Sequence, residues 1–212
     1  MFALSACDTG DGTTLQDPVA PTTLPPIDTT PLESVAIDPT DALLATVAPP
    51  DDVAEPPAPL PGETGLRLFT PWAEGGPIDA RFGCDGSNAA PPLSWSDLPD
   101  GTVEVAVALV DESNLSNGRP FVHWVMAGLT PATPGLAEGE VPIGAIQALN
   151  FFGNVAYDGP CPTLGETNSY RVTLFALNQQ VELADGTPAT QLLDLIDATA
   201  IESASVLGTS TR

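Results

Sequence analysis

Four stretches of the chain carry runs of apolar and β-branched residues that predict strands. The run TVEVAVALV over residues 102–110 is almost continuously apolar, which is typical of a strand buried on both faces. Further strands are predicted over residues 121–129, 169–177 and 204–211. Clusters of Pro and Gly at residues 90–93, 117–120, 131–135 and 159–162 separate the strands.

The strand over residues 121–129 contains His123, the only histidine in the chain. Strict alternation divides its side chains into two sets, with Phe121, His123 and Val125 on one side and Val122, Trp124 and Met126 on the other. From the residues alone, His123 is either a pocket group or a buried structural histidine with a hydrogen-bond partner.

Helical periodicity is confined to residues 188–203. Pro188 suits a first helical turn, and Leu192, Leu193, Leu195 and Ile196 form an apolar stripe. Because strands dominate and the helix comes late, the pattern predicts a β-rich sandwich or barrel with a helix near the C-terminus.

Composition divides the chain near residue 65. Residues 1–66 contain half of the 24 prolines, no Lys or Arg, and Phe2 as their one aromatic residue. Such a segment cannot bury enough apolar surface to offset the entropy of ordering it. We therefore predict a disordered, acidic Pro/Thr/Asp-rich tether over residues 8–63 and a folded domain over residues 64–212.

The charge excludes some partners. The chain carries 28 acidic residues against five arginines and no lysine, for a formal charge of −23. Nucleic-acid binding and electrostatic docking to anionic lipid both depend on basic clusters, so neither is expected. The acidity favours solubility.

Cys7 ends the sequence LSAC over residues 4–7, which resembles the lipobox of bacterial lipoproteins. In those proteins the cysteine is lipidated and begins the mature chain. We interpret residues 1–7 as the remnant of a lipoprotein signal whose start is truncated. The expectation is an exported bacterial protein, anchored at the cell envelope by a lipid on Cys7 and touching the membrane only through it.

Two further cysteines, Cys84 and Cys161, lie in the predicted domain. An exported domain with two cysteines usually pairs them, so a disulfide is predicted, with two separate buried thiols as the alternative. With no C-x-x-C motif and one histidine, no metal site is expected.

The segment CDGSNAAPPLSW over residues 84–95 resembles the signature of the phosphatidylethanolamine-binding protein family, in its bacterial Raf-kinase-inhibitor-like branch. The resemblance continues in order through VDES at 110–113, FVHWV at 121–125, FFGNVAYDGPCP at 151–162, YRVTLFAL at 170–177 and LGTSTR at 207–212. It covers the chain from residue 66 to its end and implies a Greek-key β-sandwich with short peripheral helices.

The resemblance also implies a small surface cavity that binds phosphate-like or other anions, including a phospholipid headgroup. The positions carried over as ligand-binding are Asp85, Glu112, Phe121, His123, Gly159, Pro160, Cys161 and Tyr170. No cofactor is implied. A protein partner is left open, and so is a homodimer, which bacterial members often form.

Two loops depart from the family pattern. The family's Asp-Pro-Asp loop is replaced by Glu112-Ser113-Asn114, and its His-Arg-Tyr stretch by Asn168-Ser169-Tyr170. Arg171 follows Tyr170, so strand alternation predicts that it projects from the opposite face. The pocket is therefore expected to take a different anion, bind weakly or have lost binding.

Three functions compete. The first is a non-enzymatic module that binds a small anion around His123, and the second is an inhibitor of a protease or kinase that acts independently of the pocket. The third, a hydrolase, lacks a G-x-S-x-G motif, a Ser-His-Asp order and zinc spacing, so no enzyme is predicted.

Overall fold

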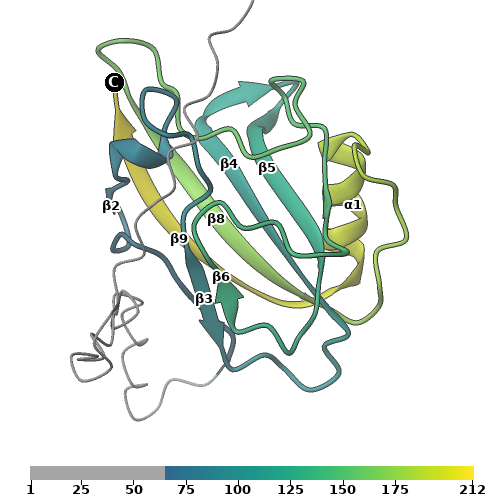
Figure 1. The fold of residues 1–212 in the computed structure, drawn as a ribbon. Coiled ribbons are helices and arrows are strands. Elements are labelled where there is room, and N and C mark those ends of the chain that lie inside the picture. The colour runs from purple at the N-terminus through teal and green to yellow at the C-terminus, as the bar shows by residue number, and fades with distance from the viewer. Residues whose placement is uncertain (1–64) are drawn as a thin grey trace, which may run out of the picture. The chain divides into compact units, whose positions relative to one another are not determined.

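A computed structural model describes residues 65–212 (Figure 1). The predicted lipidation site at Cys7 and the predicted tether lie outside these residues. The described part is mainly β, as the sequence predicts. Its strands are β1 (Arg67–Phe69), β2 (Gly76–Pro77), β3 (Leu93–Ser96), β4 (Glu104–Ser116), β5 (Arg119–Leu129), β6 (Gly135–Leu136), β7 (Ile146–Gln147), β8 (Thr167–Leu177) and β9 (Ala200–Thr211).

The strands form two sheets. The larger has the order β2-β9-β8-β4-β5-β7, and the smaller has the order β1-β3-β6. All pairs are antiparallel except β2 with β9. The chain passes from β5 to β8 on the far side of β4, a connection of the Greek-key kind.

The central strands β4 and β5 are buried on both faces over residues 104–109 and 122–127, which explains their near-continuous apolar sequences. One face packs against the smaller sheet through a cluster that includes Leu109, Trp124, Met126, Tyr170 and Leu174. The other face carries Ala108, Val122 and Val125 and packs against the apolar side of the helix α1 (Ala189–Thr199), as Figure 1 shows.

Two long antiparallel pairs, the β4–β5 hairpin and β8 with β9, build the larger sheet. Asn117 and Gly118, with φ of 52° and 78°, form the two-residue turn between β4 and β5, because left-handed residues match the twist of the paired strands. The β8–β9 pair runs over almost the whole of both strands. The predicted helix over residues 188–203 is too long, since α1 ends at Thr199 and β9 begins at once.

The expected peripheral helices are α1 and one short 3-10 turn, η1 (Ala80–Phe82). Asp79 caps this turn by accepting a hydrogen bond from the backbone N–H of Arg81. Neither helix of residues 65–212 is long and apolar enough to cross a membrane.

Candidate functional site

His123 occupies a β-bulge in β5. Leu109 of β4 pairs with Trp124, and the next residue, Val110, pairs with Val122, so His123 has no partner across the ladder. An extra residue of this kind bends the strand and changes the direction in which the side chain of the bulged residue points.

The bulge overturns the alternation expected for β5. Trp124 lies in the same apolar cluster as Tyr170, and the His123 ring contacts the Tyr170 ring edge-on. His123 and Trp124 therefore share one face of the sheet, although alternation puts them on opposite sides. Val122 and Val125 share the other face, beneath α1.

Backbone carbonyls fix the tautomer of His123. Its Nδ1 lies 2.9 Å from the carbonyl oxygen of Asp158 and 3.1 Å from that of Gly159. Since both oxygens only accept hydrogen bonds, Nδ1 carries a proton and donates it. In the neutral imidazole Nε2 is then an acceptor, and it has no hydrogen-bond partner among residues 65–212.

Burial lowers the pKa of His123, a residue that is only 2% exposed, because the charged imidazolium loses hydration. The carbonyls of Asp158 and Gly159 and the charges of Asp111 and Asp158 act in the opposite direction. The imidazole is therefore predominantly neutral at pH 7.

Aromatic rings surround His123. Its ring centroid lies 5.4 Å from Phe121, 5.1 Å from Phe152 and 5.2 Å from Tyr170, all in edge-type geometry. Phe121 also contacts Phe151 and Phe152. Phe152 is 47% exposed, so this aromatic wall extends from the buried imidazole to the protein surface.

Tyr170 presents a buried hydroxyl beside the imidazole. The residue is fully buried, and its Oη has no hydrogen-bond partner among the described residues. Burial raises the pKa of Tyr170 and the nearby Asp111 carboxylate raises it further, whereas the Cys161 backbone N–H and the Asn168 side chain lower it. The Asp111 carboxylate, the Cys161 N–H and the Asn168 side chain therefore lie around the Tyr170 Oη, but none of them meets it at both the distance and the angle of a hydrogen bond.

Asp111 is the acidic residue of the site. It pairs with Phe121 on β5 and with Tyr170 on β8, which places the three in one row across the sheet. Its Oδ1 accepts from the Ser113 backbone N–H at 2.8 Å, and its Oδ2 accepts from the Asn168 amide at 2.7 Å. Asp111 is a buried residue, only 2% exposed.

Glu112, the acidic residue expected in the site, lies on the opposite face. Its carboxylate accepts hydrogen bonds from Nε and Nη2 of Arg171, which also contacts Ser205. A one-residue step along a strand reverses the side of the sheet, so Asp111 faces His123 and Glu112 does not. The predicted orientation of Arg171, away from Tyr170, is confirmed.

The loop that supplies the two carbonyls is held by amide side chains. Asn150 donates to the carbonyl oxygens of His123 and Ala156 and to the Asp158 carboxylate, at 3.1, 3.1 and 2.7 Å. Asn88, with φ of 53°, accepts from the Gly159 backbone N–H at 2.7 Å. This network positions the loop against the imidazole.

The predicted disulfide between Cys84 and Cys161 is confirmed. The Cys84 backbone N–H also donates to the Pro160 carbonyl at 3.0 Å, which joins the two loops a second time. Asp85 does not turn toward His123; its carboxylate is bound by both arms of the Arg212 guanidinium, at 2.8 and 2.9 Å. Asp85 thus stabilises the outer edge of this junction.

Of the sequence-predicted residues, five supply atoms at the imidazole or the Tyr170 hydroxyl: Phe121, His123, Gly159, Cys161 and Tyr170. Pro160 braces the loop, while Asp85 and Glu112 lie elsewhere. Sequence reasoning missed Asp111, Asn150, Phe152, Asp158 and Asn168. Asp111, Phe152 and Asp158 lie inside the segments 110–113 and 151–162, which resemble the family. The resemblance indicates these segments but not which of their residues lie beside His123.

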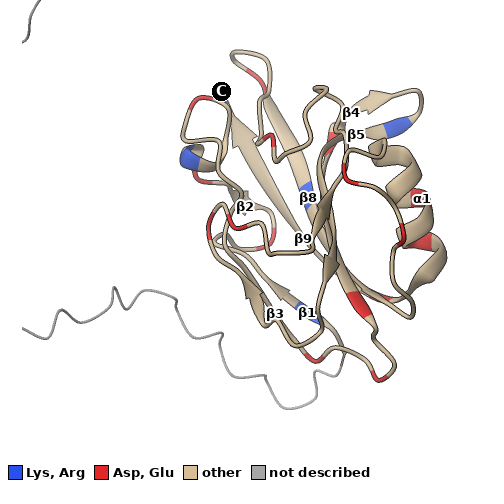
Figure 2. Cartoon of the chain, turned by 45° about the vertical axis from the view of Figure 1, so that its right-hand side comes forward, with Lys and Arg blue, Asp and Glu red and all other residues tan. Residues whose placement is uncertain are grey.

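The arginines at positions 119, 171 and 212 are engaged away from His123. They pair with Asp194, Glu112 and Asp85 respectively. Figure 2 shows acidic positions spread over many loops and the few basic positions scattered among them. These three guanidinium groups therefore do not contact the His123 imidazole.

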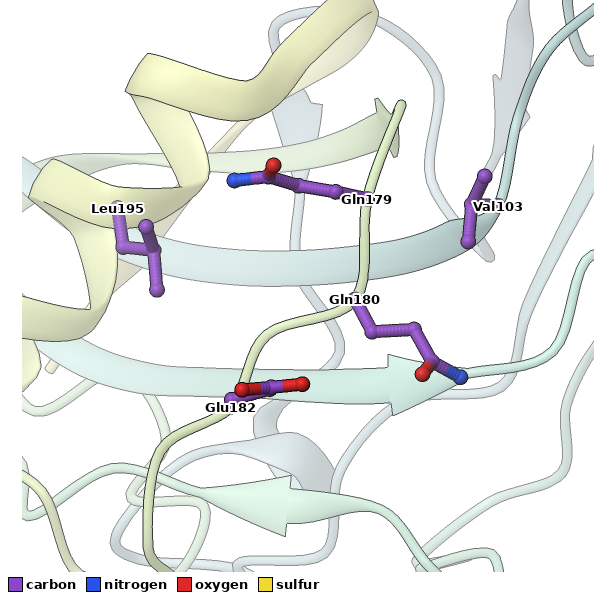
Figure 3. Close-up of a pocket in the computed structure, with 5 residues that line it drawn as sticks. All are labelled: Val103, Gln179, Gln180, Glu182 and Leu195. Atoms are coloured by element: carbon purple, nitrogen blue, oxygen red, sulfur yellow. The ribbon is translucent and has the colours of Figure 1, made fainter.

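Two surface cavities do not have His123 among their lining residues. One, of about 550 Å³, is lined by Val103, Gln179, Gln180, Glu182 and Leu195 beside α1 (Figure 3). Another, of about 320 Å³, has Trp124, Met126 and Tyr157 among its lining residues. Across residues 65–212, no three His, Cys, Asp or Glu side chains are grouped so that they could hold a metal ion.

Comparisons with known proteins converge on one family. The family model described as "Phosphatidylethanolamine-binding protein" matches residues 70–211. The protein named "Putative lipoprotein LppC" of Mycobacterium tuberculosis is 37% identical over 153 residues, covering 71% of this chain and 75% of that protein. A UPF0098 protein of Methanothermobacter thermautotrophicus is 32% identical over 138 residues, covering 63% of this chain and 89% of that protein.

Solved structures share the fold. CT736 from Chlamydia trachomatis, described as a "Putative PhosphatidylEthanolamine-Binding Protein (PEBP) Homolog", has a TM-score of 0.65 and 28% identity, covering 71% of this chain and 99% of that one. Escherichia coli YbcL has a TM-score of 0.64 at 22% identity, covering 70% and 99% of the two chains. At 22% identity, the similarity to YbcL shows only a shared fold.

Proposed function

Because the chain belongs to the phosphatidylethanolamine-binding protein family, we propose that its domain is a non-enzymatic module that binds a small anion at His123. The ligand is a phosphate or a phosphorylated headgroup, held between the imidazole, the Tyr170 hydroxyl and the Cys161 backbone. The protein is exported and tethered to a membrane.

The buried, unpaired hydroxyl of Tyr170 carries this proposal. An unsatisfied polar group inside a protein costs about 1–3 kcal/mol. A core Phe at this position would avoid that cost, so the hydroxyl needs another reason to be there. A ligand oxygen that accepts its hydrogen bond supplies one.

A second donor supports an anionic ligand. The Cys161 backbone N–H faces the Tyr170 hydroxyl, and the Cys84–Cys161 disulfide holds that segment in place. Donors fixed before binding stabilise a bound anion without reorganising. The aromatic wall of Phe121 and Phe152 keeps water away from one side and strengthens these hydrogen bonds.

The imidazole adds a proton-linked contribution. Neutral His123 offers an acceptor at Nε2, so an anion that bears no proton gains nothing from it. Protonation of Nε2 turns it into a charged donor. Binding of an unprotonated anion should therefore take up a proton and strengthen as the pH falls toward the lowered pKa of His123.

The surroundings of His123 support a binding role over a catalytic one. Its described contacts are aromatic rings and two backbone carbonyls, and the one hydroxyl among them belongs to Tyr170. The raised pKa of Tyr170 makes it a poor nucleophile at neutral pH.

Export and anchoring rest on separate observations. A relative carries the name "Putative lipoprotein LppC", and Cys7 of this chain stands in a lipobox-like sequence outside the described residues. A disulfide in the domain fits an oxidising compartment outside the cytoplasm. We propose that lipid on Cys7 anchors the chain and that residues 8–63 tether the domain.

The test is an amide NMR titration of the full chain with phosphate and with phosphoethanolamine. Wild type is compared with Tyr170→Phe, which removes one hydroxyl, and with Glu112→Gln, which alters the opposite face. Saturable shifts around His123 and Cys161 that weaken only in Tyr170→Phe support the proposal. No shifts at millimolar ligand refute it, and a partner protein captured equally by Tyr170→Phe would favour the inhibitor alternative.

A further inference from the structure

We propose that the Cys84–Cys161 disulfide is a thiol-exchange site, which an external thiol opens at Cys84 while Cys161 leaves as a thiolate held by Arg212. The product is a mixed disulfide on Cys84. The partner is a thiol whose other groups are cationic or neutral. The proposal does not depend on anion binding at His123.

The bridge lies at the protein surface. Cys84 is an exposed residue and Cys161 is half-buried. Exposed disulfides are the ones that exchange with thiols, whereas buried structural bridges resist reduction. Because Cys84 is the more exposed of the two residues, its sulfur is the one that an external thiolate reaches more easily.

Arg212 makes the two sulfurs unequal. Its Nη1 lies 3.6 Å from Sγ of Cys161, in hydrogen-bond geometry, while its Nε and Nη2 bind the Asp85 carboxylate. A guanidinium beside a cysteine sulfur stabilises the thiolate. Cys84 instead precedes the acidic residue Asp85, whose charge disfavours a second anion. Since the sulfur with the better stabilised thiolate leaves faster, Cys161 is the leaving group.

The backbone holds Arg212 in this position. Its N–H donates to the Glu166 carbonyl at 3.2 Å, and its carbonyl accepts from the Gly165 N–H at 2.7 Å. The guanidinium is therefore in place beside Cys161 before the bridge opens.

The exchange step balances without any other oxidant or reductant. The external thiol loses its proton to solvent, and its thiolate attacks Sγ of Cys84. A new sulfur–sulfur bond forms there as the bond to Cys161 breaks, and the electron pair of that bond passes to Sγ of Cys161. The external sulfur is oxidised to the disulfide level and Cys161 is reduced. Attack of the Cys161 thiolate on Cys84 reverses the step and expels the external thiol.

Other contacts keep the two loops together when the bridge is open. The Cys84 backbone N–H donates to the Pro160 carbonyl at 3.0 Å, and the Tyr157 hydroxyl donates to the Phe82 carbonyl at 2.9 Å. The Asn88 side chain accepts from the backbone N–H of the 157–161 loop at 2.7 Å. Opening therefore frees the two cysteine side chains without separating their loops, and the bridge can form again.

Charge selects among thiols. The chain has a formal charge of −23, and the Asp85 carboxylate lies next to the attacked residue in the sequence. A field of this sign repels anionic molecules and attracts cationic ones. Thiols with a further negative group should therefore open the bridge slowly, and thiols with an ammonium group should open it fast.

The first experiment reduces the full chain and measures how fast iodoacetamide modifies Cys84 and Cys161 near neutral pH, with peptide mapping to separate them. Every protein carries Cys7→Ser, so that only the two bridge cysteines react. Exposure alone predicts faster modification of Cys84, whereas the guanidinium predicts faster modification of Cys161, by about tenfold.

Arg212→Gln should remove this preference. Arg119→Gln is the matched control, because it deletes a guanidinium that pairs with Asp194 instead, and it should keep the preference. Faster modification of Cys84 in the parent protein overturns the assignment of Cys161 as the leaving group. A preference that persists in folded Arg212→Gln overturns the role of Arg212.

The second experiment treats the oxidised parent protein with cysteamine or with mercaptopropionate at equal thiolate concentrations. Each rate is divided by that of the same thiol with oxidised mercaptoethanol. We expect cysteamine to be favoured by about tenfold, with its adduct on Cys84 after an acid quench and peptic mapping. Asp85→Asn should narrow the gap between the two thiols.

An adduct on Cys161, or a bridge that neither thiol opens while the chain stays folded, overturns the proposal. Equal relative rates for the two thiols overturn the charge selection. The position of the adduct in the parent protein needs no change at Arg212, so it tests the proposal even if Arg212→Gln folds poorly.

Discussion

His123 and Trp124 are consecutive residues whose side chains lie on the same face of the larger sheet. The bulge in β5 makes this possible, because Leu109 and Val110 pair with Trp124 and Val122 and leave His123 between them. Trp124 packs into the core against Tyr157, whereas His123 turns toward Phe121 and Tyr170. One extra residue in the strand thus places a polar group at the edge of an apolar core.

Tyr170→Phe separates stability from binding. Removing a buried hydroxyl that has no partner among the described residues should leave the free energy of unfolding unchanged or raise it by about 1 kcal/mol. The same change should weaken phosphate binding, because a donor to the ligand is lost. Denaturant unfolding and a phosphate titration measure the two effects; a variant that loses stability and keeps full affinity contradicts the assignment of Tyr170.

Stability should fall as the pH drops through the titration of His123. Its folded-state pKa is lowered by burial, while the unfolded chain titrates near 6.5. Between these values the unfolded state binds more protons, so the free energy of unfolding decreases with decreasing pH.

His123→Asn should flatten this dependence. Comparing the two proteins between about pH 7.5 and about pH 5 isolates the histidine. Buried Glu104, whose pKa is raised by burial, contributes with the opposite sign, and its contribution cancels in the comparison. Identical pH profiles for the two proteins would show that His123 is not titrating as a buried base.

Gly159→Ala should disrupt the loop beneath His123. A Cβ at this position collides with the backbone carbonyl of Phe82, which cannot rotate away. We expect a loss of about 3 kcal/mol or more in unfolding free energy, with a weakened phosphate response. Gly153→Ala, with φ of 86° and open space around it, is the control and should cost about 1 kcal/mol from backbone strain alone. Equal costs would mean that the collision is relieved cheaply.

Removal of the disulfide should weaken both the fold and the site. Cys84 and Cys161 are 77 residues apart, and the loss of a loop constraint of this size costs about 4–5 kcal/mol on the chain-entropy argument. The Cys161 backbone N–H also becomes free to move from the Tyr170 hydroxyl. Denaturant unfolding of Cys84→Ala/Cys161→Ala, followed by a phosphate titration, measures both; undiminished affinity would exclude a role for the bridge in binding.

The four long strands of the larger sheet, β4, β5, β8 and β9, could be predicted from the sequence because they coincide with apolar or β-branched runs bounded by turns, whereas the two-residue strands β2 and β7 carry no such signal. The β4–β5 hairpin is marked by Asn117-Gly118. The end of α1 was missed because residues 200–203 suit a helix by propensity, whereas pairing with β8 holds them in a strand. Tertiary pairing outweighed local preference there.

The candidate site could be predicted less completely than the fold, because the register of the strands decides which side chains face His123. The adjacent acids Asp111 and Glu112 are equivalent in sequence, and only their pairing with Tyr170 and Arg171 shows which one faces the histidine. The bulge at His123 has no glycine or proline beside it to mark it. The loop residues Asn150 and Asp158 act through contacts with the backbone, which no spacing along the chain reveals.

The most direct test of the anion site is the ¹⁵N spectrum of the single imidazole. One histidine in 212 residues gives one assignable pair of nitrogen signals. In the free protein at neutral pH we expect a protonated Nδ1 and an unprotonated Nε2. Saturating phosphate should move the Nε2 signal to that of a hydrogen-bonded or protonated nitrogen, and Tyr170→Phe should weaken this response. An Nε2 signal unchanged by phosphate would show that His123 is a core residue and that no anion binds there.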